Sequence, residues 1–242
     1  MPTDRWVRAD TEVLLRPALE GRDEEAVAAV HSAARRAAPM PDPVHTDAEV
    51  RQWLAARVLE DPVWVAERDG EVVAYARFPG PWLDDLYVHP DHAGTGIGSA
   101  LLDLVKSERP EGFCLWVFES NVPARAFYAR HGLVELERTD GQANEERSPD
   151  VRMVWPGADP LAFLRGLVDE VDVQLGDLLA RRVALTRVIQ RHKAAHGGAP
   201  RDPDREAEVA RVVAARAPEL GEVRLRRIVD AIIRESLDAT GG

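Results

Sequence analysis

The sequence predicts two domains, a mixed α+β domain over residues 1–156 and an all-α domain of three helices over residues 157–242. A chain of 242 residues is long for a single domain. The first part alternates short apolar runs with helical stretches, whereas the second part contains only segments of helical period. The net charge of −11 belongs wholly to the first part, because residues 157–242 carry 14 acidic and 14 basic side chains.

The composition excludes several classes of protein. Hydrophobic residues make up 45% of the chain, which is enough for ordinary buried cores. No run approaches about 18 apolar residues and the first residues lack a cationic and apolar leader, so we expect neither a membrane span nor secretion. A single cysteine, Cys114, and no Cys/His cluster with zinc spacing predict neither a disulfide nor a metal site. The acidic balance argues against nucleic-acid binding, and we expect a cytoplasmic protein.

Short apolar runs predict the strands of the first domain, at residues 13–18, 63–67, 71–78, 85–88 and 113–118. At the end of this domain, Pro156-Gly157-Ala158-Asp159-Pro160 form a connector rich in turn residues. Neither a helix nor a strand is expected to cross such a segment. We therefore place the domain boundary between residues 156 and 157.

A glycine-rich turn joins a strand that ends at Val88 to a predicted helix. The turn contains Gly94, Gly96 and Gly98, and the helix after it has an apolar stripe at Ile97, Leu101, Leu104 and Val105. Glycines allow successive N–H groups to converge without Cβ atoms in the way, and the helix adds the positive end of its dipole. The pattern favours binding of a pyrophosphate. A glycine loop that binds nothing is the plain alternative.

A second strand, at residues 113–118, is followed by Glu119-Ser120-Asn121 and the helix VPARAFYARHG. Through the Gly96-Ile97-Gly98 turn, Asn121, and the stretch from Ala126-Phe127-Tyr128 to Gly132-Leu133, residues 11–155 resemble the GNAT superfamily of acetyl-coenzyme A-dependent N-acetyltransferases. The resemblance implies an α+β fold with a mostly antiparallel sheet. It also implies acetyl-CoA as the co-substrate and an amine as the acetyl acceptor.

The resemblance assigns roles to particular residues. Backbone amides of residues 94–99 would hold the coenzyme pyrophosphate, Asn121 would bond the pantetheine arm, and Tyr128 would protonate the departing thiolate. The family usually has Gln or Arg where this chain has Ala93, a departure expected to cost little because the donors are main-chain groups. The expected coenzyme-binding residues are Val88, Gly94, Thr95, Gly96, Ile97, Gly98, Ser99, Asn121 and Tyr128.

Acetyl transfer to an amine requires a group that removes the proton of the amine. Asp84, Asp85 and Glu119 are candidate bases, and each is equally well interpreted as a solvated acid at a strand end. Alternation along the strand predicts that at most one of Asp84 and Asp85 faces the cleft. The acidic first domain favours a cationic acceptor. Five histidines are expected to be ordinary surface residues: His31, His45, His89, His92 and His131.

In the second domain a long helix is predicted from about residue 160 to residue 196. Its apolar residues are separated alternately by three and four positions, as in a helix packed lengthwise on another: Leu161, Leu164, Val168, Val171, Leu175, Leu178, Leu185 and Ile189. At ~1.5 Å per residue this helix is roughly 55 Å long, too long for a small monomer to cover. A partner chain is therefore expected.

Two cations lie on the apolar seam of this helix. Arg182 interrupts it, and Lys193, one of two lysines in the chain, follows three turns later on the same face. Arg165 lies about 25 Å before Arg182 along the axis, so the two would meet one small ligand only from antiparallel neighbouring chains.

Two shorter helices follow a turn at residues 196–200. Asp202 and Pro203 begin the first, whose stripe of Val209, Val212 and Val213 extends back to Arg205 and Glu206. The second, over about 220–239, has the stripe Leu225, Val229, Ile232, Ser236 and Thr240. Buried cations need partners, and the nearby carboxylates are fewer, so an anionic ligand is expected.

On these residues, including Leu164-Arg165, Lys193, the run from Asp202 to Glu206, and Ile232 to Ser236, the segment 159–240 resembles the all-helical chorismate mutases. The resemblance implies an intertwined dimer of three-helix chains. It also implies the pericyclic rearrangement of chorismate to prephenate without nucleophile, metal or cofactor. Catalysis then comes from holding the dianion in a compact conformer and stabilising charge on the breaking ether oxygen.

The resemblance assigns the mutase roles as follows. Arg182, Arg205 and a partner's Arg165 would grip the two carboxylates, and Lys193 would reach the ether oxygen. Asp202 and Glu206 would meet the ring hydroxyl, and Ser236 would support a carboxylate. Thr240 stands where the family commonly has Gln or a protonatable Glu, and its shorter side chain leaves the rate of turnover open.

The sequence thus predicts a fusion of an acetyltransferase with a chorismate mutase. Two alternatives stay open for the second domain. Its substrate is 4-amino-4-deoxychorismate or another chorismate relative, which would link the mutase to an amine acetylase. Otherwise it is a non-catalytic module that senses chorismate or dimerises the chain and thereby regulates the acetyltransferase.

Overall fold

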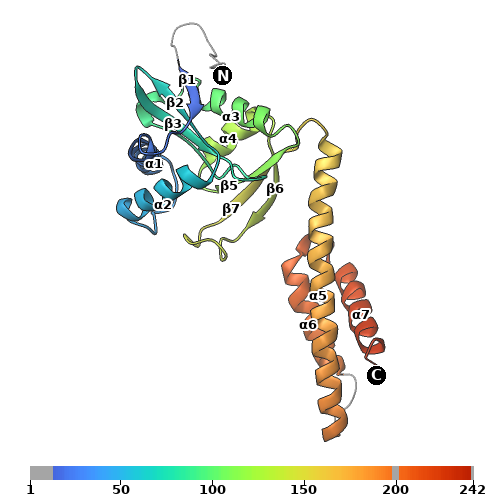
Figure 1. Ribbon diagram of the computed structural model, residues 1–242. Coiled ribbons are helices and arrows are strands. Elements are labelled where there is room, and N and C mark those ends of the chain that lie inside the picture. Colours follow the sequence, from blue (N-terminus) through green and yellow to red (C-terminus); the bar gives the residue numbers. More distant parts are fainter. Residues whose placement is uncertain (1–12, 198–201, 241–242) are drawn as a thin grey trace. The chain divides into compact units, whose positions relative to one another are not determined.

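The computed structural model describes residues 13–197 and 202–240. Residues 1–12 and 241–242, and residues 198–201 in and after the predicted turn, lie outside the described residues. The chain divides into two compact units, Met1–Leu164 and Arg165–Gly242 (Figure 1). Each unit is described by itself.

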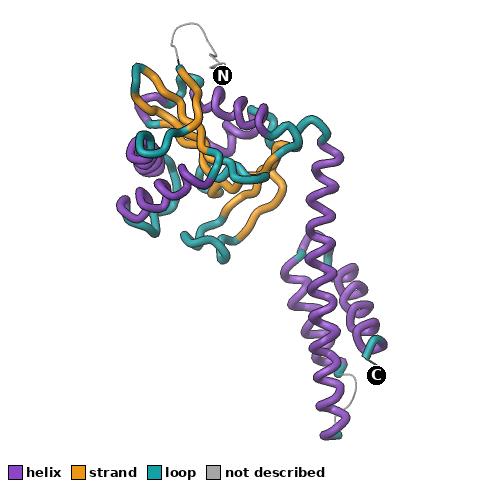
Figure 2. Tube along the Cα trace, viewed as in Figure 1, coloured by secondary structure: helices purple, strands orange, loops and turns teal. Residues whose placement is uncertain are grey.

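The first unit contains two antiparallel sheets, drawn in orange in Figure 2. The strands of the first sheet follow one another in sequence order: β1 (Leu14–Pro17), β2 (Val63–Arg68), β3 (Glu71–Arg77) and β4 (Asp85–Val88). The second sheet has its last strand in the centre, in the order β5 (Phe113–Phe118), β7 (Asp150–Trp155) and β6 (Val134–Thr139).

Helices α1 (Glu24–Ala37) and α2 (Asp47–Glu60) pack on one face of the first sheet, and α3 (Ile97–Glu108), which follows the 3₁₀ turn η1 (Pro90–His92), packs on the other. Helix α4 (Val122–Arg130) contacts β6 of the second sheet. Successive side chains of a strand point to opposite faces. Accordingly Ala74 and Ala76 of β3 join the core under α3, whereas Tyr75 joins a second cluster with Val27 and Val30 of α1. The buried strands of this sheet therefore contribute side chains to two separate hydrophobic cores.

The two sheets meet at one point and then separate. The N–H of Leu83 donates to the carbonyl of Cys114 (2.8 Å), and the N–H of Cys114 donates to the carbonyl of Pro81 (2.9 Å). Beyond this parallel bridge, β4 and β5 belong to different sheets. The edge strands β4 and β5 are thus joined at this bridge and diverge beyond it.

The five predicted strands are confirmed as β1 to β5, with ends that differ by no more than two residues. Two strands, β6 and β7, were not predicted by apolar runs. Residues 134–137 of β6 alternate apolar and acidic side chains but form no apolar run, and every residue of the strand except Thr139 is exposed. Pairing with β7 makes this segment a strand although it adds no buried apolar face.

The second unit is built from helices: most of α5 (Pro160–His196), then α6 (Pro203–Arg216), the 3₁₀ turn η2 (Pro218–Leu220) and α7 (Glu222–Asp238). The predicted 160–196 helix is confirmed, as is the start of α6. The Asp202 carboxylate caps α6 by accepting the N–H of Arg205 at 3.1 Å. A small core forms between α6 and α7, where Ala210, Val229 and Ile233 are buried.

Within the described ranges, no helix has both the length and the apolar character that crossing a membrane requires.

Gly112 is a position where the fold demands glycine. Its φ is +119°, a region that L side chains rarely adopt. A Cβ here would lie 2.8 Å from the Trp155 carbonyl and 2.7 Å from the Phe163 ring, so the first turn of α5 packs directly on this backbone.

We expect Gly112→Ala to lower the free energy of unfolding by about 2–4 kcal/mol, because the Trp155 backbone cannot move aside and the φ value is strained. Gly166→Ala is the matched control. Nothing lies near a Cβ at this helical glycine, so alanine should raise stability by roughly 0.5–1 kcal/mol. Urea unfolding of both variants measures the two effects. Equal stability of Gly112→Ala and the wild type would contradict the close approach.

Candidate functional site

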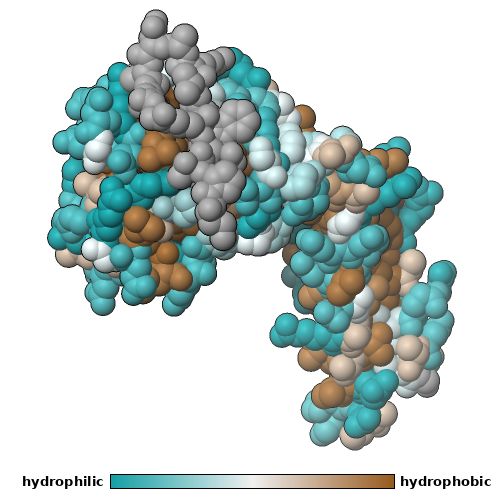
Figure 3. All heavy atoms as spheres, turned by 45° about the horizontal axis from the view of Figure 1, so that its top comes forward, coloured by the Kyte–Doolittle hydropathy of each residue, from teal (hydrophilic) through white to brown (hydrophobic). Residues whose placement is uncertain are grey.

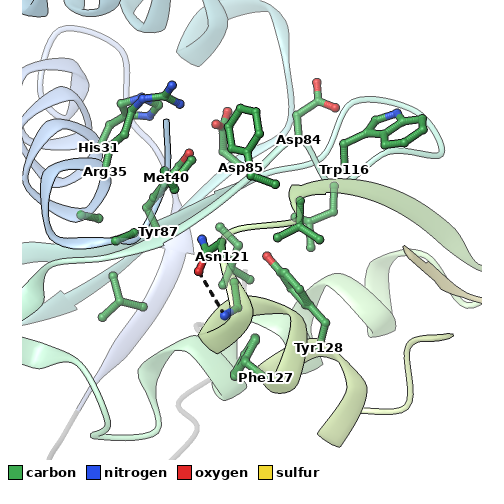
Figure 4. Close-up of a pocket in the computed structure, with 18 of the residues that line it drawn as sticks. His31, Arg35, Met40, Asp84, Asp85, Tyr87, Trp116, Asn121, Phe127 and Tyr128 are labelled. Carbon is green, nitrogen blue, oxygen red and sulfur yellow. Dashed lines mark hydrogen bonds between the residues drawn. The ribbon is translucent and has the colours of Figure 1, made fainter. Parts of the chain in front are cut away.

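A cavity of about 1450 Å³ opens in the first unit where β4 and β5 part (Figure 4). One side is lined by β4, the turn before α3, β5 and α4. The other side is lined by α1, the loop after it, α2 and the loop between β6 and β7. The cavity therefore joins the glycine turn to a second compartment formed by the N-terminal helices.

The glycine turn forms the start of α3. Gly94 (φ +75°) and Gly96 (φ +88°) both have left-handed backbone, and no described side chain caps the helix. The first N–H groups of α3 have no partner within the helix, and the helix dipole makes this end positive. A Cβ on Gly98 would lie 3.4 Å from Val88 and 3.7 Å from Phe127, so glycine lets α3 approach β4 and α4 closely. This arrangement suits an anion bound by main-chain donors.

The predicted coenzyme-binding residues fall into two groups. Most of them line the cavity: Val88, Gly94, Gly96, Gly98, Ser99, Asn121 and Tyr128. Two others, Thr95 and Ile97, are not among the residues that line it. The Ile97 side chain is buried in the core, and the Thr95 hydroxyl donates to the His92 carbonyl at 2.7 Å.

Asn121 caps α4, because its side-chain oxygen accepts the N–H of Ala124 at 3.2 Å. The amide nitrogen points away from the helix (Figure 4) and is placed to donate into the cavity. Tyr128 is only 8% exposed, and its hydroxyl faces the cavity in Figure 4. Burial, with a smaller contribution from Tyr87 and Asp85, raises the pKa of the Tyr128 phenol well above its ordinary value. The phenol therefore holds its proton at neutral pH.

The candidate bases differ in their surroundings. The prediction that at most one of Asp84 and Asp85 faces the cleft is wrong, because both line the cavity. Asp84 precedes the first residue of β4, so strand alternation does not govern its direction. Asp85 lies 2.5 Å from the Arg77 guanidinium, with both side chains buried. Asp84, 37% exposed, lies 3.0 Å from the same guanidinium, and burial raises the pKa of its carboxyl. Glu119 pairs with Arg138 at 2.7 Å and is not among the cavity-lining residues.

In the second unit, Arg182 and Ser236 meet. The Arg182 guanidinium donates to the Ser236 hydroxyl at 2.6 Å and to the Ile232 carbonyl at 3.3 Å, which joins α5 to α7. Ser236 is buried, and its hydroxyl also donates to Ile232 at 2.6 Å. One turn later the Thr240 hydroxyl donates to the Leu237 carbonyl at 2.8 Å. Arg182 and Ser236, two of the predicted site residues, are thus in contact, and Thr240 follows Ser236 closely in the sequence.

The other predicted mutase residues differ in exposure and in the groups they contact. Lys193 and Glu206 are half-buried and take part in polar interactions. Asp202 is the cap of α6. Arg205 is exposed and pairs with Glu208 at 2.5 Å, and Arg165 is exposed on α5.

The seam of α5 is also uncovered within one chain. No residue of this helix is buried. Leu178 is 61% exposed, and Figure 3 shows brown, hydrophobic side chains on the helical unit. The exposed apolar residues of the seam, called the α5 seam below, are Leu161, Val168, Val171, Leu175, Leu178, Leu185 and Ile189.

Comparison with known families matches residues 60–135 to the GNAT acetyltransferase domain and residues 164–240 to the type II chorismate mutase domain. Peptidyl-lysine N-acetyltransferase YjaB of Escherichia coli (strain K12) is 32% identical over 112 residues, which is 46% of this chain and 75% of the relative. The chain belongs to the GNAT acetyltransferases and carries a type II chorismate mutase domain behind the acetyltransferase domain.

Other relatives cover the GNAT unit. Peptidyl-lysine N-acetyltransferase YjaB of Salmonella typhimurium is 29% identical over 110 residues, 45% of this chain and 75% of the relative. Among solved structures, a GCN5-related N-acetyltransferase from Rhodopseudomonas palustris has a TM-score of 0.52 and 24% identity, covering 63% of this chain and 99% of its own. Ard1 from Thermoplasma volcanium has a TM-score of 0.50 and 20% identity, covering 61% of this chain and 99% of its own. These structures have the fold of the GNAT unit.

Charged and aromatic side chains shape the second compartment of the GNAT cavity. Arg35 pairs with Glu146, and the His45 ring lies 2.8 Å from Glu145, so two loops meet at its rim. The aromatic lining residues include Trp53, Tyr87 and Trp116. The cavity is acidic, because two arginines, Arg35 and Arg130, face six carboxylates: Glu49, Asp84, Asp85, Glu145, Glu146 and Asp150.

The prediction of surface positions is wrong for two histidines of the GNAT unit. His31 is 9% exposed and bonds the Tyr75 hydroxyl at 2.8 Å. It lies four residues after buried Val27 on α1, so helical spacing was the available signal. His131 is half-buried and contacts the Ser99 hydroxyl at 2.9 Å and the Phe127 carbonyl at 2.8 Å, which ties α3 to α4. Among residues 13–197 and 202–240, no group of His, Cys, Asp and Glu is placed to hold a metal ion.

We expect Asn121→Ala to lower the free energy of unfolding by about 1 kcal/mol, because it removes the cap of α4. Asn121→Asp keeps the capping oxygen at the positive end of the helix and should retain stability. Urea unfolding of both variants measures the difference. If the alanine and aspartate variants are equally stable, the cap contributes nothing.

Proposed function

We propose that this protein is a bifunctional enzyme. In the GNAT unit it transfers an acetyl group from acetyl-CoA to an amine, and in the mutase unit it rearranges chorismate to prephenate. The observation that carries the first activity is the cavity that runs from the glycine turn to Tyr128 and on to an acidic compartment. The observation that carries the second is the contact of Arg182 with Ser236 beside the uncovered α5 seam.

The lining of the GNAT cavity suits acetyl-CoA, the acetyl donor of this family. The main-chain amides of residues 94–99 would hold the pyrophosphate, because the glycines leave them accessible at the positive end of α3. Val88 and Asn121 would lie along the pantetheine arm, with the Asn121 amide donating to one of its carbonyls. The family consensus side chain missing at Ala93 is not needed for this set of main-chain donors.

Tyr128 would act as the general acid. The departing coenzyme leaves as a thiolate, and a thiol has an ordinary pKa near 8.5. The pKa of the Tyr128 phenol is raised by burial, so the phenol is protonated when the thiolate forms. The phenol would donate a hydrogen bond to the departing sulfur and pass on a proton that solvent restores to the phenol, because its raised pKa exceeds that of the thiol.

The charge of the cavity favours a cationic acceptor. Its carboxylates outnumber its guanidinium groups, and Arg35 is already paired with Glu146. An ammonium group is attracted to such a site, whereas a dianion is repelled. Relatives of the chain are named peptidyl-lysine N-acetyltransferases, and a lysine side chain has this character. The same charge argues against 4-amino-4-deoxychorismate as the acetyl acceptor.

Tyr128→Phe should lower kcat for acetyl transfer about 10²-fold or more, because the thiolate loses its acid. The dissociation constant of acetyl-CoA should change little, since the ring remains in place. Thiol release with a lysine peptide as acceptor measures kcat, and calorimetry measures binding. Unchanged kcat in the variant would remove Tyr128 from this role.

The proposed mutase is a homodimer. Most of the α5 seam is more than half exposed, and large exposed apolar patches mark interaction surfaces. A second copy of the chain fits, because antiparallel α5 helices would bring the partner's Arg165 toward Arg182, some 25 Å away along one helix. Arg205 and Lys193 would complete the cationic set around the dianion, with Asp202 and Glu206 at the ring hydroxyl. Ser236 already orients Arg182.

Thr240 bears on how fast this mutase turns over. Its hydroxyl donates to the Leu237 carbonyl, so as placed its hydrogen is not directed to a substrate. Lys193 is then left as the main donor to the ether oxygen. Because of Thr240, two alternatives remain: the domain acts on a chorismate relative, or it binds its ligand without a reaction. Side-by-side assays with chorismate and 4-amino-4-deoxychorismate distinguish them.

A complementation experiment tests the shared site. Arg165→Ala and Arg182→Ala should each abolish chorismate loss, followed by ultraviolet absorbance. Co-expressed, the two variants form mixed dimers with one intact site, so about a quarter of the wild-type activity per chain should return.

Arg187→Ala, a charge removal at an exposed position of the same helix, is the control and should keep full activity. Activity lost in both variants without recovery in the mixture would contradict a site shared between chains. Chorismate binding without turnover in the wild type would favour the sensing module instead.

A further inference from the structure

His31 lines the second compartment of the GNAT cavity, although the acetyl transfer proposed above does not use this residue. It comes from α1, at a position buried against β3 and β4. Burying an imidazole is unfavourable unless its polar atoms have partners. The partners of His31 therefore define what its ring can do.

One ring nitrogen of His31 is tied into a chain of buried polar groups. Nδ1 lies 2.8 Å from the Tyr75 hydroxyl, which is fully buried. The charge of the Asp85 carboxylate, which pairs with the Arg77 guanidinium at 2.5 Å, also acts on this hydroxyl. A negative charge attracts the hydroxyl hydrogen of Tyr75, which favours the arrangement in which the Tyr75 oxygen accepts from the Nδ1–H of His31. In that arrangement Nε2 is the unprotonated nitrogen.

The surroundings keep the ring neutral. Burial lowers the pKa of His31 below 6.5; Arg35 and Arg77 add to this effect, and Asp85 and Asp47 oppose it. The centroid of the Tyr87 ring lies 4.7 Å from the centroid of the His31 ring. Burial raises the pKa of the Tyr87 phenol to about 12, so Tyr87 carries no charge at neutral pH. A neutral imidazole with a fixed tautomer is a proton acceptor at neutral pH.

His31 and Tyr128 share one neighbourhood. Tyr87 contacts the His31 ring, and Tyr87 and Asp85 both contribute to the raised pKa of the Tyr128 phenol. Figure 4 shows His31 on one side of the cavity and Tyr128 on the other, with Tyr87 and Asp85 of β4 between them. An acceptor amine that reaches the end of β4 would thus have the imidazole and the phenol on either side.

We propose that His31 is the general base of acetyl transfer, oriented by Tyr75 and Asp85; this rests on the proposed acetyl transfer. As the C–N bond forms and the C–S bond breaks, Nε2 takes one proton from the amine nitrogen, whose acidity rises when its lone pair is used. Tyr128 gives its proton to the thiolate sulfur and regains one from solvent. His31 releases its proton to solvent and Tyr128 takes one up, so no net proton is released for each neutral amine acetylated.

Asp84 is the competing base. The Arg77 guanidinium, 3.0 Å from the Asp84 carboxylate, stabilises the ionised form, whereas burial, the larger effect, raises the pKa of this carboxyl. Its side chain is also more exposed than that of His31. The two residues differ in the pH at which they titrate, so a pH profile distinguishes them.

The test compares His31→Asn with Asp84→Asn in the full chain, with a lysine peptide as acceptor. The asparagine amide can replace Nδ1 as donor to Tyr75 but carries no base. We expect His31→Asn to lower kcat about 10²–10⁴-fold with little change in acetyl-CoA binding. In the wild type, kcat/KM should fall below the pKa of His31 as the pH drops, because the protonated ring accepts nothing. This acidic limb should vanish in His31→Asn and persist in Asp84→Asn.

A second measurement does not depend on the variant folding. In the wild type, ¹⁵N NMR should place the His31 proton on Nδ1 at neutral pH. A wild-type kcat and acidic limb in His31→Asn, loss of the limb in Asp84→Asn alone, or a proton on Nε2 would each overturn the proposal. Absence of acetyl transfer by the wild type to any amine would instead overturn the proposed function itself, and this inference with it.

Discussion

The parting of β4 from β5 is the constraint on which the GNAT unit depends. Two main-chain bonds hold the strands together at Cys114, and the sheets then separate. Strands at a sheet edge present backbone donors and acceptors that seek partners. The elements that follow each strand, the turn into α3 and the helix α4, are thereby brought to the two sides of one opening. For this reason the glycine turn, Asn121 and Tyr128 all line the cavity.

A buried ion-pair cluster shapes the other half of that cavity. Arg77 binds Asp85, Asp84 and Asp61, and its guanidinium stacks 4.7 Å from the Trp53 ring. Such charges are tolerated because each has a partner. The cluster joins β3, β4 and the end of α2, and through Tyr75 it reaches α1. The acidity of the compartment and the orientation of His31 have the same origin.

The helical unit illustrates the opposite situation, in which one chain does not complete its own packing. The contact of Arg182 with Ser236 assembles part of a cationic site inside a protomer. The α5 seam and Arg165 stay exposed, since a helix of 37 residues has more length than two short helices can cover. The proposed second copy of the chain would cover the exposed leucines of this seam and bring a ligand site to Arg165.

The sequence by itself determined much of the secondary structure and both family resemblances, because these depend on local periodicity and on short motifs such as Gly96-Ile97-Gly98. It located the ends of α5 at about residues 160 and 196, since turn residues mark both of its ends. Strand β6 and the roles of His31, His131 and Arg77 were decided only by the tertiary structure. Their partners lie far along the chain, as Tyr75 does from His31, and no local pattern records which distant side chain satisfies a buried polar group. The separation of the sheets, which turns a glycine loop into one end of a cavity, likewise arises from long-range pairing.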